Sequence, residues 1–246
     1  MYLEMHRQNV LVLARVTGVH PRALRASQKR KPQISIGYKI IVVNDLSTDQ
    51  TRAIVERLTR QYDNVTLVNR KGNHGLGRCI TRGFEELDDG YVVIVMADLA
   101  DDVSDIPKMA AELDKGFDLV CGSRYKKGGS ANHHLKLKGF LSRLLGRALR
   151  ILTGIPIHDP TNAFKMYRTG LLDKIGILRS DNYASGLEVL VKAYCLGYKV
   201  TEIPTVWKDR SFGSSHFRIL KVAPEYIHWT LWAIFKTWRY RLFGKR

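Results

Sequence analysis

Cysteine is scarce: this chain of 246 residues has only Cys79, Cys121 and Cys195. An odd number of widely separated cysteines does not make a disulfide framework, and their spacing is not that of a metal-binding motif. We therefore expect free thiols in a reducing compartment. A signal-peptide pattern is also lacking, because Arg15 interrupts the apolar stretch at 10–16, so export is not expected.

The sequence lacks a hydrophobic run long enough to cross a membrane as a helix. Its most apolar stretch near the end covers only 226–235, about half of the length that a helical span needs. We expect this stretch to touch a bilayer without crossing it.

Acidic residues are few, with 23 Asp and Glu against 40 Lys and Arg, which gives a formal charge of +17. Such an excess favours a polyanionic neighbour, which is a nucleic acid, an anionic membrane surface or a phosphorylated substrate. No RNA- or DNA-reading motif accompanies the charge, so we expect no nucleic-acid partner.

A dinucleotide-binding fingerprint is also missing. The segment GNHGLG has glycines at 72, 75 and 77, which is not the G-x-G-x-x-G order, and no acidic residue follows at the required distance. This excludes an NAD-type site as the leading interpretation. The glycines instead predict a tight turn that enters a helix.

Strands and helices alternate regularly from residue 38 onward. Apolar, β-branched runs predict strands at 38–43, 65–69, 91–96 and 117–123, with helical patterns between them. This alternation predicts an α/β fold with a mostly parallel sheet and helices on both faces. One domain over 38–220 follows, between a basic, divergent or partly disordered segment at 1–37 and an aromatic, basic tail at 221–246.

Carboxylates follow two of these strands. Asp98 follows the strand at 91–96, and Asp101 and Asp102 come within one turn, so the three are candidate ligands of Mg²⁺ or Mn²⁺. The alternative is that Asp101 and Asp102 only cap the helix that Pro107 opens. Asp45, at the tip of the first strand, is a candidate partner of a base or ribose, or closes an Asx turn.

Two arginines and one glutamate are further candidates. Arg124 follows the strand at 117–123 and Arg210 precedes FGSS, and both lie near glycines in expected loops, where a guanidinium can meet a phosphate. Glu188 lies in an expected helix, either as a buried orienting group or as a surface charge.

Two segments are amphipathic and basic. Leucines, Phe140 and Ala148 recur at helical spacing over 135–152, with Lys and Arg on the other faces. Aromatic residues and cations interleave over 226–246, which is typical of a headgroup layer. We interpret the pair as membrane-interfacial helices, and the alternative for 135–152 is a surface helix that packs its leucines on the core.

Seven segments complete the pattern. They are IIVVNDLSTDQT, GNHGLGRCITRGF, VVIVMADLADDVSDIP, FDLVCGSRYKKGG, HDPTNAFKMYR, SGLEVLVKAYCLGYKVTEIP and DRSFGSSHF, in this order. The series resembles the inverting glycosyltransferases of family 2, in particular the dolichol-phosphate or polyprenyl-phosphate mannosyltransferase type. The resemblance covers roughly residues 36–220.

The resemblance implies a GT-A fold, a nucleotide-diphosphate sugar donor of the GDP-mannose or UDP-glucose type, a divalent cation and a polyprenyl phosphate acceptor at a membrane. It also implies site residues, position by position. Asp45 contacts the nucleoside and Asp98 the metal; Arg124, Lys138 and Arg210 hold phosphates; Ser142, Asp159 and Ser215 line the acceptor side; and Glu188 is a further site residue.

Three positions depart from the family pattern. Residues 1–37 contain no segment like the usual Pro-x-Tyr-Asn-Glu, Met96 stands at the first acid of the usual D-x-D, and Lys138 stands at a family Arg. Asp98 with Asp101 or Asp102 is then left to bind the metal.

The leading hypothesis is an inverting hexosyltransferase that acts on a polyprenyl phosphate, peripheral on the cytoplasmic face of a membrane. One alternative keeps the fold but uses a non-lipid acceptor. Another is a catalytically impaired relative that serves as a nucleotide- or membrane-binding scaffold.

Overall fold

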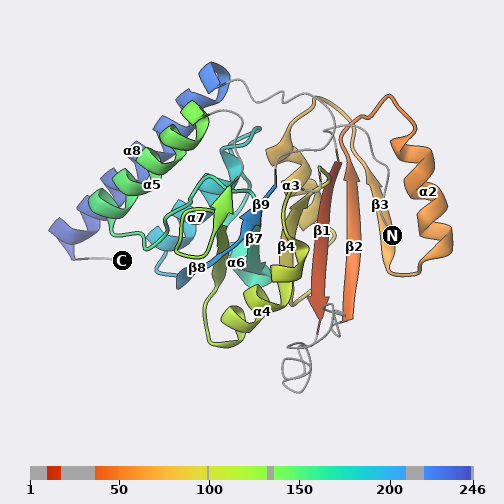
Figure 1. The fold of residues 1–246 in the computed structure, drawn as a ribbon, viewed down its shortest axis with the longest axis horizontal. Coiled ribbons are helices and arrows are strands. Elements are labelled where there is room, and N and C mark those ends of the chain that lie inside the picture. Colours follow the sequence, from red (N-terminus) through yellow and green to blue (C-terminus); the bar gives the residue numbers. More distant parts are fainter. Residues whose placement is uncertain (1–9, 18–36, 99, 132–135, 209–218, 245–246) are drawn as a thin grey trace.

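A computed structural model describes residues 10–17, 37–98, 100–131, 136–208 and 219–244. A seven-stranded sheet in the order β3-β2-β1-β4-β7-β5-β8 runs through the molecule (Figure 1). Its strands are β1 (Val10–Thr17), β2 (Gly37–Asn44), β3 (Val65–Asn69), β4 (Tyr91–Met96), β5 (Leu119–Ser123), β7 (Lys165–Arg168) and β8 (Val200–Pro204). A second sheet pairs β6 (Ser130–Ala131) with β9 (Val206–Trp207).

Helices connect most of the strands. They are α2 (Thr51–Gln61), α3 (Leu76–Phe84), α4 (Ile106–Asp114), which follows the short 3₁₀ helix Val103–Asp105, α5 (Lys136–Thr153), α6 (Thr169–Ile175), α7 (Ser185–Cys195) and α8 (Ile219–Phe243). The four strands and the helix at 135–152 expected from the sequence all form, with small differences at their ends.

The directions of the strands confirm a mostly parallel sheet. Strands β2, β3, β4, β5 and β8 run the same way, whereas β1 and β7 are antiparallel to both of their neighbours. The carboxyl ends of β2 and β4 therefore meet at the same edge of the sheet, and the polar residues that follow them are brought to that edge.

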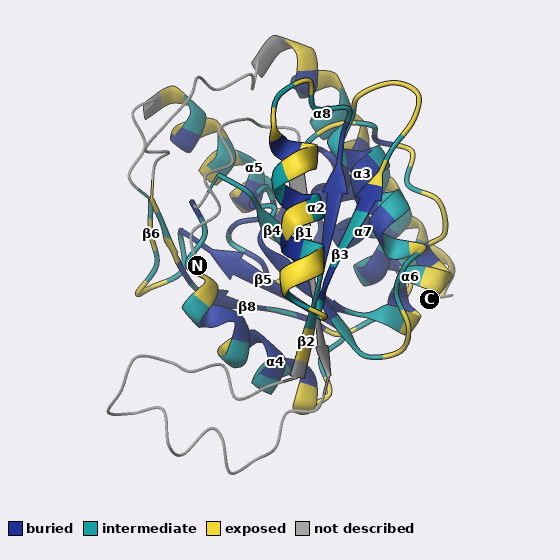
Figure 2. Ribbon diagram, turned by 90° about the vertical axis from the view of Figure 1, so that its right-hand side faces the viewer, coloured by how far each residue is buried: buried dark blue, intermediate teal, exposed yellow. Residues whose placement is uncertain are grey.

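Helices cover both faces of the sheet, because adjacent buried residues of a strand point to opposite sides. Val43 belongs to the cluster shared with α3, α7 and α8, and its neighbour Val42 packs with α2 on the other face. Val93 likewise packs with α4. In Figure 2 the strands are mostly buried, and α2 exposes its outer side to solvent. This is the layered α/β arrangement that the sequence predicted.

Strand β1 differs from the expectation for residues 1–37. Residues 10–17 do not belong to a separate arm: they lie between β2 and β4, with Val10 paired to Asn44 and Thr17 to Gly37. The run VLVLARVT is apolar and rich in β-branched residues, which suits a central strand. The rest of the predicted segment, 1–9 and 18–36, lies outside the described residues.

The helices α5 and α8 lie side by side at one end of the molecule (Figure 1). Trp238, near the end of α8, donates to the Leu152 carbonyl near the end of α5 at 3.0 Å, so the two helices run in the same direction. Within the described ranges, no helix is both long and apolar enough to cross a membrane.

The apolar stripe expected over 135–152 divides between core and solvent. Leu149 is fully buried, whereas Leu144 is 52% and Phe140 61% exposed. Together with α8, these side chains form an outward surface, here called the α5/α8 apolar face. Its exposed members are Leu137, Phe140, Leu141, Leu144, Ile151, Leu152, Ile227, Leu231, Phe235, Trp238, Leu242 and Phe243. Packing on the core therefore accounts for only part of the stripe.

Candidate active site

Asp45 and Asp98 lie at the same edge of the central sheet. Each follows the carboxyl end of a strand, β2 or β4, and β1 runs between the two strands. This is the edge at which open α/β sheets bind ligands.

Asp45 is almost fully buried and already has strong partners. Its Oδ1 pairs with the Arg70 guanidinium, and its Oδ2 accepts the Gly75 backbone N–H at 2.8 Å. The side chains of Asp45 and Arg70 are both only 7% exposed. Asp45 therefore fixes the glycine-rich turn before α3, and it does not line the pocket, described below, that α5 and α8 help to form.

The acidic turn after β4 brings two carboxylates together. Asp98 accepts the Ala100 backbone N–H at 3.2 Å, and Oδ1 of Asp101 is shielded from solvent with no hydrogen-bond partner among the described residues. Burial and the negative charge of Asp98 raise the pKa of Asp101 to about 7. An orphaned carboxylate oxygen beside a second carboxylate fits a divalent cation, which commonly binds one or two carboxylates together with substrate phosphates.

The third predicted ligand, Asp102, caps the 3₁₀ helix Val103–Asp105. Its Oδ1 accepts the Ser104 backbone N–H at 3.0 Å. Within the residues that the structure describes, no three acidic, histidine or cysteine side chains gather as a metal site. Asp102 therefore has the capping role that the alternative expected, and Asp98 and Asp101 are the two predicted ligands that line the pocket described below.

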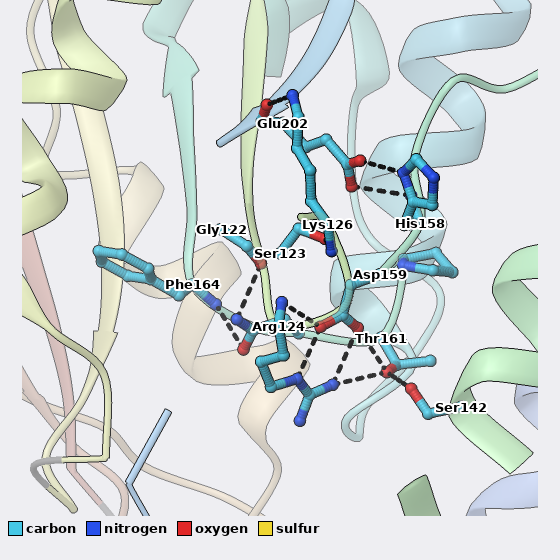
Figure 3. A network of polar contacts seen from close by, with 12 residues as sticks. Gly122, Ser123, Arg124, Lys126, Ser142, His158, Asp159, Thr161, Phe164 and Glu202 are labelled. Carbon is cyan, nitrogen blue, oxygen red and sulfur yellow. Dashed lines mark hydrogen bonds and ion pairs between the residues drawn. The ribbon is translucent and has the colours of Figure 1, made fainter. Parts of the chain in front are cut away.

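Arg124 is locked to Asp159 at the end of β5 (Figure 3). Its Nε donates to Oδ2 at 2.6 Å and one terminal nitrogen to Oδ1 at 2.9 Å, and its backbone N–H also reaches Oδ2. Burial alone raises the pKa of a carboxyl, but the Arg124 charge outweighs it and holds the pKa of Asp159 below its usual value. The Arg124 charge is thus neutralised within the protein.

The same network reaches α5. Thr161 Oγ1 accepts from Arg124 at 3.0 Å, donates to Asp159, and lies 2.5 Å from Ser142 Oγ (Figure 3). A continuous line of hydrogen bonds therefore joins the end of β5 to the first half of α5, and Ser142 is held at the edge of the site.

Two buried charged side chains hold the backbone of residues 158–162 through hydrogen bonds. The fully buried Lys165 ammonium donates to the carbonyls of Pro160 and Asn162, and burial lowers its pKa. Glu202 on β8 accepts the His158 backbone N–H at 2.8 Å and also contacts its ring (Figure 3). The backbone that presents Asp159 is thus held at both ends.

Glu188 is a buried orienting group, one of the two alternatives that its sequence allowed. It is fully buried on α7, accepts the backbone N–H groups of Arg179 and Ser180 at 2.8–3.0 Å, and pairs with Lys192 at 2.6 Å. The loop at 179–181, which Glu188 holds, contacts α3: the Gly77 N–H donates to the Asp181 carbonyl oxygen. Like Asp45, Glu188 does not line the pocket that α5 and α8 help to form.

A pocket of about 330 Å³ opens between the sheet edge and the helices α5 and α8. Its lining combines charged and polar side chains with apolar ones, and α5 contributes residues of both kinds. The charged and polar side chains include Asp98, Asp101, Arg124, Lys138, Ser142, Thr161 and Asn162, and the apolar ones include Met96, Leu141, Leu145, Trp207, Val222, Ala223, Tyr226 and Ile227. Tyr125 and Tyr183 also line it.

Five of the site residues expected from the sequence meet in this pocket: Asp98, Asp101, Arg124, Lys138 and Ser142. Asp159 acts through Arg124 and is fully buried. Arg210 and Ser215 lie outside the described residues. Sequence reasoning missed several residues of the site. Thr161 and Tyr125 stood within quoted motifs and were not singled out, and nothing in the sequence connected Trp207 and Tyr226 with the strand ends.

Sequence comparison agrees with this arrangement. Residues 25–176 match the sequence profile of glycosyl transferase family 2. The chain belongs to this family. Proteins with similar sequences include the polyprenol monophosphomannose synthase of Mycolicibacterium smegmatis, which is 32% identical over 182 residues, or 72% of this chain and 69% of that protein.

A second similar protein is the undecaprenyl-phosphate 4-deoxy-4-formamido-L-arabinose transferase of Pseudomonas fluorescens. It is 27% identical over 205 residues, which cover 82% of this chain and 57% of the transferase. The chain thus spans little more than half of that relative.

Solved structures support the GT-A fold. Glucosyl-3-phosphoglycerate synthase from Mycobacterium tuberculosis, crystallised with Mn²⁺, UDP-glucose and phosphoglyceric acid, superposes with a TM-score of 0.58 at 15% identity, over 79% of this chain and 68% of that one. At this identity the likeness shows the fold alone.

Proposed function

We propose that this family 2 glycosyltransferase moves a hexose from a nucleotide-diphosphate sugar to a polyprenyl phosphate at a membrane surface. One observation carries the proposal: a single pocket is lined both by the charged side chains Asp98, Asp101 and Arg124 and by apolar side chains that come mostly from α5 and α8. A lipid phosphate likewise combines a charged head with a hydrocarbon tail.

The charged side chains suit the donor diphosphate. Asp98 and Asp101 would hold Mg²⁺ or Mn²⁺. The positive charge of the ion would stabilise the negative charge of the nucleoside diphosphate leaving group. The orphaned Oδ1 of Asp101 supports this assignment. Relatives with this fold have been crystallised with Mn²⁺ and UDP-glucose, but the base and sugar of this chain's donor stay open between GDP-mannose and UDP-glucose types.

The acceptor side is formed by α5. Lys138 and Ser142 line the pocket one helical turn apart, and Ser142 is held by Thr161. A phosphate oxygen of the lipid attacks C1 of the sugar, and the bond from C1 to the diphosphate oxygen breaks with its electron pair, which inverts C1. The nucleophile is already anionic, so catalysis rests on alignment and on neutralised charge.

The α5/α8 apolar face supports a position on a bilayer. The two helices that carry this face also line the pocket, and Lys221, Arg239 and Arg241 are exposed on α8. Apolar helices with aromatic residues and cations bind anionic lipid surfaces. We propose a peripheral position there, on the cytoplasmic side, as expected from the sequence.

Product formation tests the proposal. The purified chain is incubated with Mn²⁺, undecaprenyl phosphate and each of several nucleotide-diphosphate hexoses, and the organic extract is analysed by mass spectrometry. We expect a polyprenyl-phosphate hexose with at least one donor and none after chelation of the metal. A panel without any lipid product, from protein that binds the nucleotide, would refute the assignment.

A second function is favoured by one feature of the sheet. Because β1 is antiparallel to β2 and β4, its carboxyl end lies at the edge opposite the site, where Thr17 pairs with Gly37. Among its described residues, β1 therefore brings only its amino end, at Val10, to the edge where Asp45 and Asp98 follow β2 and β4. A nucleotide-binding scaffold without turnover is the resulting candidate, and calorimetry with a nucleoside diphosphate and Mn²⁺ alongside the product assay separates it from the transferase.

A further inference from the structure

Two guanidinium groups lie against one aromatic ring at the pocket. Tyr125 lines the pocket directly after Arg124. The Cζ of Arg124 is 5.2 Å from the centre of the Tyr125 ring, and the Cζ of Arg143, from α5, is 4.8 Å from the same centre. At such distances a cation is attracted by the ring. Tyr125 therefore brings a charge from α5 next to the wall of the pocket.

These two cations differ in their capacity to bind a ligand. The Arg124 side chain is 8% exposed and its charge is matched by Asp159. Arg143 is exposed, and among the described residues it has no ion pair and no side-chain hydrogen bond. An exposed guanidinium without a carboxylate partner can bind a phosphate through two of its N–H groups.

We propose that Arg143, held by the Tyr125 ring, is a phosphate-binding residue of the acceptor side. The proposal rests on the proposed function for the identity of the acceptor, and its ligand chemistry is a phosphate monoester carrying a hydrocarbon chain. Arg143 directly follows Ser142, whose hydroxyl is held by Thr161 at the pocket. A phosphate near Ser142 and Lys138 would then meet a cation that no carboxylate of the described chain neutralises.

A phosphate from either of two sources could meet Arg143. One is the acceptor in the pocket, which is our proposal, and the other is a headgroup of the bilayer below α5. A water-soluble, short-chain isoprenyl phosphate separates them, because it reaches the pocket without any bilayer.

The test is direct binding of that short-chain phosphate to the full chain by calorimetry, without lipid. We expect Arg143→Gln to weaken binding by about tenfold or more, the usual scale for losing a charged hydrogen bond, and Arg143→Lys to retain part of the affinity. Tyr125→Leu is expected to behave like Arg143→Gln, whereas Tyr125→Phe, which keeps the ring, retains most of the affinity.

Arg147 supplies the matched control. It is exposed on α5 one turn after Arg143, and it makes no contact with the Tyr125 ring. Arg147→Gln removes the same charge and should leave binding of the soluble phosphate unchanged. Where turnover is measured, Arg143→Gln should raise the KM for the acceptor with little change in the KM for the donor.

Three results would overturn the inference. The first is equal affinity of the wild type and Arg143→Gln for the soluble phosphate. The second is that Arg143→Gln and Arg147→Gln weaken binding to anionic vesicles equally and leave binding of the soluble phosphate unchanged. The third is that the wild type does not bind the soluble phosphate. Binding that depends on Arg143 without any lipid product would instead uphold the inference and refute the proposed function.

Discussion

The buried pair of Arg124 and Asp159 allows a quantitative prediction. Asp159 is fully buried and the Arg124 side chain is 8% exposed. The change Asp159→Asn keeps the shape of the side chain but leaves the Arg124 charge buried without its partner. Breaking a buried pair in this way costs about 3–5 kcal/mol, out of a total stability of about 5–15 kcal/mol for an ordinary domain.

Equilibrium unfolding in urea, followed by tryptophan fluorescence, measures the loss. We expect the double variant Arg124→Met/Asp159→Asn to be more stable than the sum of the two single changes implies, since neither charge is then left alone. A loss below about 1 kcal/mol for Asp159→Asn, or simple additivity in the cycle, would show that the pair does not hold this part of the site.

The pH dependence follows from the same pair. The pKa of Asp159 is lower in the folded protein than in the unfolded chain, chiefly because of Arg124. Its contribution is therefore complete above the unfolded pKa, about 4, and is lost as the pH falls through the folded pKa. The stability difference between the wild type and Asp159→Asn should narrow below about pH 4, and a gap independent of pH would contradict the assignment.

Three further predictions concern other parts of the fold. Lys165→Met should destabilise the protein by about 2–5 kcal/mol, because two buried carbonyls lose their hydrogen-bond donor. An unchanged unfolding midpoint would show that Lys165 does not stabilise this backbone. Gly77→Ala should unfold at a lower urea concentration than the control Gly170→Ala, because a Cβ at 77 would lie 1.7 Å from the Ser180 carbonyl oxygen, whereas a Cβ at 170 would meet no atom. Equal unfolding midpoints of the two variants would contradict the close packing of Gly77 against Ser180. Phe235→Glu should weaken binding to anionic vesicles without changing the stability of the fold, because this side chain is 63% exposed. If the variant sediments with vesicles as the wild type does, the α5/α8 apolar face does not bind the membrane.

Much of the fold was predictable because its signals are local. The apolar runs at 38–43 and 91–96 and the spacing of leucines over 135–152 each specify an element without help from the rest of the chain. The same holds for Asp98, since a carboxylate directly after a buried strand must lie at the edge of the sheet. Strand β1 was missed because the surrounding residues 1–37 are basic and polar, and its place between β2 and β4 depends on pairing with distant strands.

The roles of single site residues were less predictable. Asp45 has the position expected of a ligand-binding group, but its partner Arg70 comes 25 residues later and turns it toward the protein. Asp101 and Asp102 are neighbours of the same type, but Oδ1 of Asp101 is buried without a hydrogen-bond partner, whereas Oδ1 of Asp102 accepts the Ser104 N–H. Tyr226 reaches the pocket from α8, far along the sequence, so neither spacing nor composition indicates its place.

Transfer of label from a nucleotide-diphosphate hexose into an organic-soluble lipid phosphate tests the central claim most directly. The assay compares the wild type with Asp98→Asn and with Asp102→Asn, whose side chain caps a 3₁₀ helix. We predict labelled lipid for the wild type and Asp102→Asn, and none for Asp98→Asn. Labelled lipid that forms equally in all three, or label that never leaves the aqueous phase, would contradict the account.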